Sequence, residues 1–298
     1  MLETLDHCPV CGESNYNQFL TCKDYTVSQE SFNIVECSNC NFLFTNPRPF
    51  PKDLGKYYKS EEYISHSNKS NNLVNSIYRV ARNYTLKNKL SLVNSLQSNK
   101  GSLLDLGCGT GHFLKTCKDA DWNTTGVEPD DSARSIATAQ ELKVYTAIQE
   151  LPDKQFDIIS MWHVLEHVPD LNDYLSFIKT RLAQTGTFIV AVPNHESHDA
   201  QKYKDKWAAY DVPRHLYHFD QKSMVRLMEK HSLHVKEVKP MKLDSYYVSI
   251  LSETYKGSSI EKYPKAFISG LKSNQYARKN SNNYSSLIYI IEHLNEAN

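Results

Sequence analysis

The chain has 298 residues and carries 34 basic and 34 acidic side chains, so its formal net charge at neutral pH is zero. Proteins that bind nucleic acid or an anionic membrane usually show a basic surplus, so this balance argues against both kinds of partner. The length allows a large core and more than one domain, and the lack of a signal peptide or of an apolar run of about 18 residues predicts a soluble, cytoplasmic protein.

Two C-x-x-C pairs stand near the amino terminus, Cys8 with Cys11 and Cys37 with Cys40. Each pair places two thiolates on one turn, and two pairs can close a tetrahedral four-sulfur site that has no position for water. We therefore predict a zinc ribbon over residues 1–50, in which a structural Zn²⁺ supplies folding energy that so small a segment lacks. Redox-active pairs are the alternative. Cys22 is expected to be an ordinary buried thiol.

Residues 51–100 are predicted to form a helical linker or lid. The first half is polar and aromatic and includes Tyr57, Tyr58, Tyr63 and His66. Such a stretch fits a lid or an acceptor-binding surface, and it fits a solvated connector equally well. Apolar side chains at helical spacing between residues 75 and 96 then predict a helix that packs against the main domain.

A run of apolar residues from Leu103 ends at three alternating glycines, Gly107, Gly109 and Gly111. This pattern predicts a buried parallel strand that turns tightly into a helix, in a loop whose glycines let the backbone approach a ligand closely. Glu128 ends the next strand about 20 residues later, where an acid holds the ribose hydroxyls of a bound nucleoside. A glycine-rich turn in another kind of α/β domain is the alternative.

With Asp105 two residues before the first glycine, this loop resembles motif I of the class I S-adenosylmethionine-dependent methyltransferases. The resemblance implies that Asp105 and the glycines hold the methionine end of S-adenosylmethionine and that Glu128 holds its ribose. In this family an acid after the third strand often binds the adenine amino group. The sequence there reads Ala-Ile-Gln-Glu, and Gln149 is the candidate for that contact.

Residues 101–298 alternate strand and helix patterns, which predicts an α/β, Rossmann-like doubly wound sheet. The resemblance implies seven strands, mostly parallel, with an antiparallel last strand inserted beside the sixth. Segments inserted at about 195–220 and 241–282 are expected to bind the acceptor. The later strands are predicted at residues 144–146, 156–161, 187–192, 234–239 and 287–291.

The strand predicted at residues 156–161 leads into His163-Val-Leu-Glu166-His167-Val-Pro-Asp, which resembles motif IV of the quinone-ring and sugar methyltransferase branches. The resemblance implies that His163 lies along the cofactor near its sulfonium. The same residues match the H-x-x-E-H pattern of inverted zinc peptidases. That pattern needs a continuous helix, and the strand-like residues 158–161 immediately before it argue against a peptidase.

A polar loop over residues 211–220 includes His215 and His218 and resembles a stretch in zinc-ribbon methyltransferases of sugar and surface-polysaccharide pathways. Histidine titrates near working pH, which makes His215 and His218 the preferred general bases and His167 the third candidate. Alternatively, the histidines of the loop only cap or pack the helix that begins near Asp220.

Taken with the resemblance, these features predict S-adenosylmethionine-dependent methyl transfer to a small molecule, a sugar or nucleotide-sugar in particular. An RNA methyltransferase is one alternative, because some of those carry an amino-terminal zinc ribbon, but the neutral charge counts against it. A nucleoside-binding scaffold without turnover is another, and the intact Asp105, glycines and Glu128 argue against it.

Overall fold

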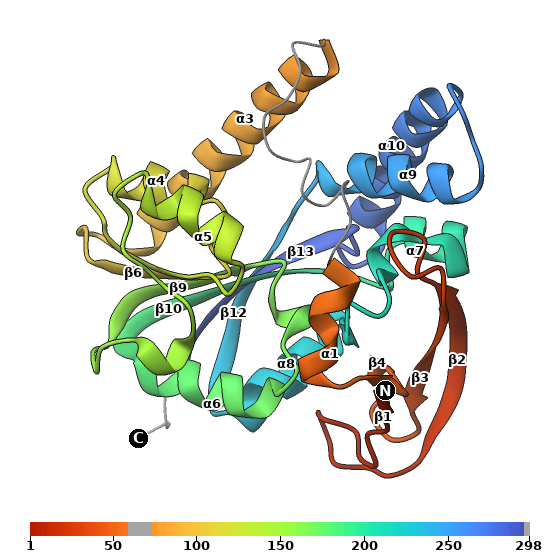
Figure 1. The fold of residues 1–298 in the computed structure, drawn as a ribbon, viewed down its shortest axis with the longest axis horizontal. Helices are drawn as coiled ribbons and strands as arrows, with labels where there is room; N and C mark the ends of the chain where they lie inside the picture. Colours follow the sequence, from red (N-terminus) through yellow and green to blue (C-terminus); the bar gives the residue numbers. More distant parts are fainter. Residues whose placement is uncertain (59–72, 295–298) are drawn as a thin grey trace.

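The computed structural model describes residues 1–58 and 73–294, and a seven-stranded sheet lies at its centre (Figure 1). The strand order is β12–β13–β10–β9–β6–β7–β8. Strand β13 is antiparallel to both of its neighbours, and the other recorded pairs are parallel. This confirms the predicted sheet, with the last strand beside the sixth. The bounds are β6 Ser102–Leu106, β7 Asn123–Val127, β8 Val144–Tyr145, β9 Phe156–Trp162, β10 Leu182–Pro193, β12 Leu233–Pro240 and β13 Ser286–His293.

The strand order reverses at β6. Strands β7 and β8 continue the sheet on one side of β6, whereas β9 and β10 continue it on the other. In open α/β sheets, ligands bind outside the carboxyl ends of the strands at such a switch point. The segments that leave β6 and β9 therefore mark the place where a cofactor would bind.

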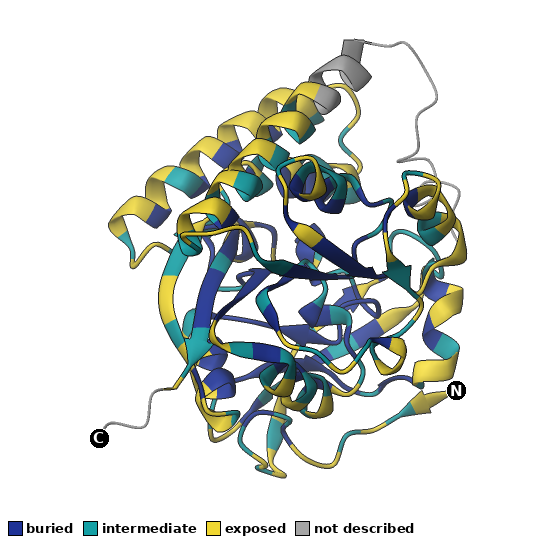
Figure 2. Ribbon diagram, turned by 90° about the vertical axis from the view of Figure 1, so that its left-hand side faces the viewer, coloured by how far each residue is buried: buried dark blue, intermediate teal, exposed yellow. Residues whose placement is uncertain are grey.

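Helices cover both faces of the sheet (Figure 1). Successive side chains of a strand point to opposite faces. Leu103 and Ile158 accordingly pack under α3, α4 and α5, whereas Leu104 and Ile159 pack toward α6 and α8. Figure 2 shows the result, with buried strands between helices whose outer sides are exposed. The bounds are α3 Leu73–Leu96, α4 His112–Lys118, α5 Asp131–Thr138, α6 Leu171–Arg181 and α8 Gln221–Lys230.

The amino-terminal ribbon forms a second sheet of order β11–β4–β3–β2. Its edge strand β11, Tyr217–His218, comes from the main domain and pairs with β4. Phe42 and Phe44 of the ribbon are fully buried, and the ring of Phe42 packs on Phe219. The ribbon and the polar loop therefore share one core. The bounds are β1 Leu2–Glu3, β2 Tyr16–Lys23, β3 Ser31–Cys37, β4 Leu43–Thr45 and β5 Arg48–Pro49, and β1 pairs with β5.

After the ribbon, the chain forms two short helical turns, α1 (Pro51–Leu54) and η1 (Gly55–Tyr58). Tyr63 and His66 lie outside the described residues. The predicted linker helix is α3, which packs on the sheet through the fully buried Val93. The domain boundaries near residues 50 and 100 stay a prediction.

Two helices near the carboxyl terminus, α9 (Asp244–Tyr255) and α10 (Lys262–Lys279), form an antiparallel pair beside α7 (His198–Tyr203). The pair is closely packed, since a Cβ added at Gly270 would lie 2.6 Å from the Tyr246 ring. Two single helical turns, η4 (Lys204–Lys206) and η5 (Ala208–Tyr210), follow α7. None of the helices within residues 1–58 and 73–294 is long and apolar enough to cross a membrane.

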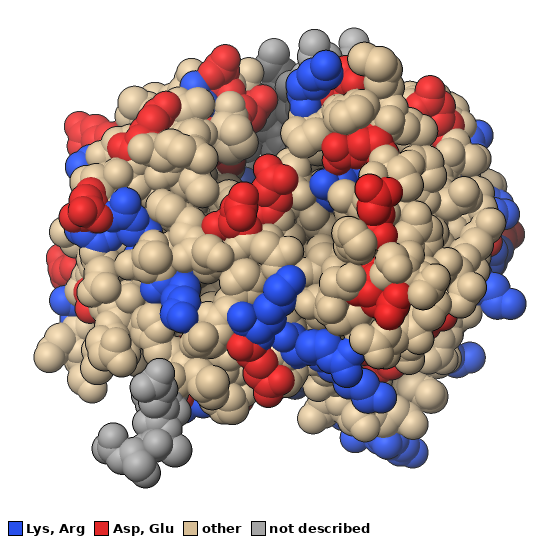
Figure 3. Space-filling model, turned by 90° about the horizontal axis from the view of Figure 1, so that it is seen from below, with Lys and Arg blue, Asp and Glu red and all other residues tan. Residues whose placement is uncertain are grey.

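Basic and acidic side chains are mixed on the face seen in Figure 3, with no broad area of one sign. This agrees with the zero net charge of the sequence. A phosphate backbone is bound through a basic patch or stripe. This face does not present one.

Candidate active site

The glycine loop after β6 has the backbone conformation that its sequence predicts. Gly107, Gly109 and Gly111 all have positive φ angles, of 71°, 53° and 80°. A Cβ at Gly107 would lie 2.5 Å from Val164, and one at Gly111 would lie 2.5 Å from Leu142. A Cβ at Gly109 would meet no atom of the described residues within 4 Å. Two glycines are therefore needed for packing, and the middle one borders open space that a ligand can enter.

Glu128 holds this loop against the end of β7. Its Oε2 accepts a hydrogen bond from Gly109 N at 2.7 Å, and its Oε1 accepts one from Asp130 N at 2.9 Å. Only 8% of the residue is exposed, and burial raises the pKa of Glu128 although both amide bonds oppose that shift. The carboxylate therefore lies beside the open space at Gly109, and its contact with a ribose stays a prediction.

Asp105 lies at the end of β6, behind the loop. The Ser160 hydroxyl of β9 donates to its Oδ1 at 2.6 Å. Burial raises the pKa of Asp105 to about 7, against the effects of this bond and of the Lys89 charge. Lys89 of α3 places its ammonium 4.1 Å from the centre of the Trp162 ring. Burial lowers the pKa of Lys89 to about 8, although Asp105 and Asp244 attract its charge.

His163 follows β9 directly and has a positive φ of 57°, a conformation that is uncommon for a residue with a side chain. Its Nε2 lies 3.1 Å from Asp244 Oδ2 of α9, and its Nδ1 lies 3.3 Å from Glu166 Oε1. Burial alone would lower the pKa of His163, but the two carboxylates raise it to about 10. Both ring nitrogens of His163 therefore face carboxylates, an arrangement that favours the protonated imidazolium and disfavours a role as general base.

Glu166, His167 and His215 form a cluster beside His163. One potential ligand atom from each lies within 4.8 Å of the others, and the two imidazole rings meet edge to face with centroids 4.5 Å apart. Glu166 and His167 belong to the single helical turn η3 (Leu165–His167), whereas His215 comes from the polar loop. Burial lowers the pKa of His167 to about 4, and the neighbouring His215 adds to that effect.

The polar loop is fixed from the ribbon side by Arg214, which is 2% exposed. Its guanidinium donates to Asp211 of the loop, to Asp24 of the ribbon at 3.1 Å, and to the Tyr57 carbonyl oxygen at 2.9 Å. The Thr45 hydroxyl of β4 donates to the His215 carbonyl oxygen at 2.8 Å. The position of His215 therefore depends on contacts with the amino-terminal 58 residues.

The other two candidates stand apart from this cluster. His218 is 5% exposed on β11 and its Nε2 lies 3.1 Å from the Thr45 hydroxyl. Burial lowers the pKa of His218 far below the usual range, so it resembles the packing histidine of the alternative interpretation more than a base. Gln149 is exposed in the turn η2 (Ile148–Glu150) after β8, and its contact with adenine stays a prediction.

Known proteins resemble this chain in sequence and in fold. A family model described as a methyltransferase domain matches residues 78–238, which is more than half of the chain. The chain belongs to the methyltransferase family. A ubiquinone biosynthesis O-methyltransferase of Rickettsia bellii is 28% identical over 145 residues, which cover 45% of this chain and 60% of that protein. A ubiquinone biosynthesis O-methyltransferase of Paramagnetospirillum magneticum is 29% identical over 101 residues, which cover 31% of this chain and 41% of that protein.

The fold of this methyltransferase has a solved counterpart. Magnesium protoporphyrin IX methyltransferase from Synechocystis PCC 6803, crystallised with bound SAH, aligns with a TM-score of 0.52 at 13% identity, covering 80% of this chain and 98% of that one. At this identity the likeness concerns the fold. Together with the family match, it confirms the resemblance to the class I S-adenosylmethionine-dependent enzymes. The chain spans only 60% or less of the length of the curated relatives cited here.

The zinc peptidase alternative is excluded for this methyltransferase. An H-x-x-E-H site needs both histidines and the glutamate on one continuous helix. Here β9 ends at Trp162, His163 has a positive φ, and only a single helical turn follows, over Leu165–His167. Glu166 lies near both histidines, but through a strand end and a turn and not along one helix.

The four cysteines of the predicted ribbon come together. Cys8 Sγ lies 3.5 Å from Cys40 Sγ, and Cys11 Sγ lies 3.5 Å from Cys37 Sγ. All four sulfur atoms lie within 4.8 Å of one another. This donor set and spacing fit one tetrahedral Zn²⁺, which these residues would hold as a closed structural site. Cys22 lies apart from them as a buried thiol, as expected.

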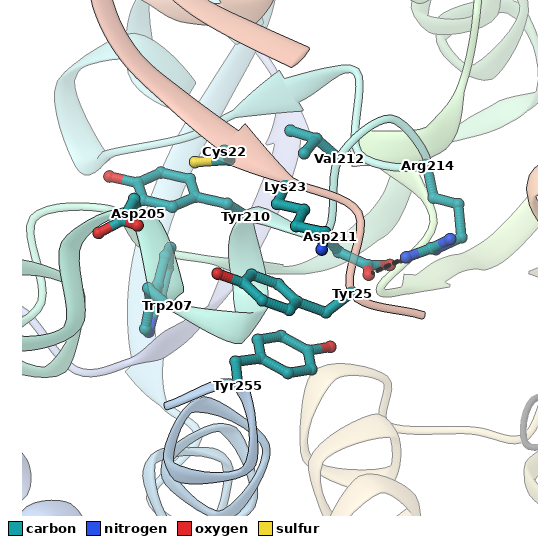
Figure 4. Close-up of a pocket in the computed structure, with 10 residues that line it drawn as sticks. All are labelled: Cys22, Lys23, Tyr25, Asp205, Trp207, Tyr210, Asp211, Val212, Arg214 and Tyr255. Carbon is teal, nitrogen blue, oxygen red and sulfur yellow. Dashed lines mark hydrogen bonds and ion pairs between the residues drawn. The ribbon is translucent and has the colours of Figure 1, made fainter. Parts of the chain in front are cut away.

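A pocket lies between the ribbon, the loop that contains Asp211 and Arg214, and α9 (Figure 4). The stacked rings of Tyr25 and Tyr255, with centroids 4.4 Å apart, line it together with Trp207. Its volume of about 10 Å³ is at the lower limit for a single water molecule. In this structure it is too small for a methyl acceptor.

Two residues of the site were missed by sequence reasoning. Lys89 is one of many lysines in the chain, and its only signal was its place on α3 between Leu86 and Leu90, which both pack on the sheet. Asp244 lies 81 positions from His163 in the chain, and no local pattern connects them. The packing of α3 and α9, which no local sequence pattern predicts, brings both residues to the site.

Proposed function

We propose that this protein transfers the methyl group of S-adenosylmethionine to a hydroxyl group of a small molecule. The observation that carries the proposal is the pairing of Glu128 with Gly109 beside open space, at the switch point of a sheet from the methyltransferase family. Asp105, Gly107, Gly109, Gly111 and Glu128 would hold the cofactor. The cofactor brings the activated methyl, and the chain supplies alignment and acceptor activation.

The acceptor would approach from the side of Glu166, His167 and His215. A hydroxyl group needs a base while the methyl moves, and in the simplest route His215 takes that proton, with His167 next to it. We prefer His215 as the general base, because burial depresses the pKa of both other candidates, His167 and His218. A sugar or nucleotide-sugar remains the proposed acceptor, on the resemblance of the loop at residues 211–220.

A phenolic quinone precursor is the second candidate. It is favoured by the names of the curated relatives, which are ubiquinone biosynthesis O-methyltransferases. Both candidates present a hydroxyl group as the nucleophile. An RNA acceptor is disfavoured by the zero net charge.

The test is transfer of a labelled methyl group from S-adenosylmethionine to panels of nucleotide-sugars, dihydroxyphenols and RNA. Incorporation into one of the first two panels supports the proposal. Incorporation into RNA alone would overturn the small-molecule acceptor. Calorimetric binding of S-adenosylmethionine with no transfer to any panel would favour the scaffold alternative.

A further inference from the structure

We propose that Glu166, His167 and His215 bind a divalent transition-metal cation on the acceptor side of the site. This inference rests on the proposed function for its role, but not for its geometry. Two imidazoles and one carboxylate are a common ligand set for Fe²⁺, Zn²⁺ and related ions, and three protein ligands leave coordination positions open. Within residues 1–58 and 73–294, this cluster and the four cysteines are the groups close enough to share an ion.

The spacing suits a single ion. The ligand atoms of the three residues lie within 4.8 Å of one another. With metal–ligand bonds of about 2.0–2.2 Å, atoms on a common ion are about 3 to 4.4 Å apart. A small contraction therefore brings the cluster to coordination distance. The chain segments that would move are a single helical turn and a loop.

A backbone carbonyl fixes the tautomer of each histidine, and His215 Nε2 also lies 3.9 Å from Asp211 Oδ2. His215 Nδ1 lies 2.9 Å from the Ala209 carbonyl oxygen, and His167 Nδ1 lies 3.0 Å from the Arg214 carbonyl oxygen. A carbonyl oxygen only accepts, so each Nδ1 carries the proton and each Nε2 keeps its lone pair. Ligand histidines characteristically donate their second N–H to a carbonyl or carboxylate in this way. The Tyr58 hydroxyl, 3.0 Å from His167 Nδ1, further restrains that ring.

Glu166 lacks the donors that a buried carboxylate needs. The residue is completely buried, and among the described residues His163 Nδ1 lies 3.3 Å from its Oε1, while Oε2 has no hydrogen-bond donor. His163 is in turn shared with Asp244. A buried carboxylate with an incomplete set of partners is costly. A cation at the cluster would supply the missing partner for this carboxylate.

A cation there would activate the acceptor. An acceptor hydroxyl bound at an open position would have a lower pKa, because the cation stabilises the oxyanion. The hydroxyl proton leaves to water, and the oxygen attacks the methyl carbon. The carbon–sulfur bond breaks, its electron pair stays on sulfur, and the products are a methyl ether and S-adenosylhomocysteine. His167 and His215 then act as ligands, and the cation replaces the histidine base of the simplest route.

Manganese distinguishes this site from the ribbon. Mn²⁺ is a harder ion that a carboxylate suits, whereas the four thiolates select softer ions such as Zn²⁺. The full-length protein, first dialysed against EDTA, should bind one equivalent of Mn²⁺ when the titration is followed by electron paramagnetic resonance. Glu166→Gln and His215→Ala should each weaken this binding at least tenfold. His234→Ala, which changes an exposed histidine on β12, should leave it unchanged.

Methyl transfer by the same preparations separates this inference from the proposed function. We expect transfer to stop after EDTA treatment and to return with Mn²⁺. A wild-type protein that binds neither Mn²⁺ nor Co²⁺ at the cluster and transfers methyl groups without added metal would overturn the cation and leave the function standing. Mn²⁺ binding that survives in Glu166→Gln would also overturn the site. Stoichiometric, variant-sensitive Mn²⁺ binding without transfer to any acceptor would support the site and contradict the function.

Discussion

Asp105 is an ionisable group with 2% of its surface exposed, and its pKa is raised by burial to about 7. Ionised Asp105 would attract the ammonium group of the cofactor, whereas the protonated form would not. The protonation state of this one carboxyl should therefore control how tightly the cofactor binds near neutral pH.

We predict that the affinity for S-adenosylmethionine rises about tenfold between about pH 5.5 and pH 7.5, because the cofactor binds the ionised form of Asp105. Calorimetric titration across this range measures it. Asp105→Asn should bind weakly and show little dependence on pH. The stability of the cofactor-free protein should change with pH in the opposite direction to the cofactor affinity. A carboxyl whose pKa rises on folding stabilises the fold while protonated, so its contribution is lost as pH rises through about 7.

Glu128 should also contribute to the affinity for the cofactor. Glu128→Ala should weaken S-adenosylmethionine binding by one to two decades, since a charge-assisted bond to a ribose hydroxyl contributes about 1.5–3 kcal/mol. Glu128→Gln keeps an acceptor oxygen for the Gly109 amide and should lose less. Asp173→Ala on the exposed side of α6 is the matched control. An unchanged dissociation constant in the alanine variant would remove Glu128 from the site.

At the scale of elements, the site is built where a few segments meet at the carboxyl edge of the sheet. The glycine loop and Glu128 could be predicted, because their function depends on local spacing around one strand end. Lys89 could not, since the pattern of α3 does not show that its lysine faces the sheet edge. Nor could the meeting of Glu166 with His215, or of His163 with Asp244, because each pair joins segments far apart in the chain.

Helix α3 places a cationic side chain next to the site. The Lys89 ammonium lies over the Trp162 ring next to the site, where it could pair with the cofactor carboxylate. Lys89→Met should lower the affinity for S-adenosylmethionine about tenfold or more. Lys87→Met, on the exposed side of the same helix, should not. Equal affinities of the two variants in a calorimetric titration would show that α3 only covers the sheet.

In the molecule as a whole, the ribbon and the methyltransferase domain share one sheet edge and one core. We predict that the purified protein holds one Zn²⁺ on Cys8, Cys11, Cys37 and Cys40 after dialysis against EDTA, because four thiolates close the coordination shell. Elemental analysis measures it. Less than about half an equivalent with intact thiols would contradict the zinc ribbon. Removing this zinc under denaturing conditions should prevent refolding of the ribbon, since metal binding supplies its folding energy.

The short strand β11 limits how this protein can be divided or rebuilt. It belongs to the ribbon sheet by pairing and to the methyltransferase domain by sequence, and it follows His215 by only two residues. Deleting residues 1–50 would leave Tyr217 and Phe219 without the aromatic rings that now cover them. It would also expose an unpaired strand edge of the kind that promotes aggregation. A ribbon grafted from a relative would also reposition His215. Substitutions in the ribbon and in the polar loop therefore have to be compatible with each other, and the two segments should be exchanged together in any chimaera.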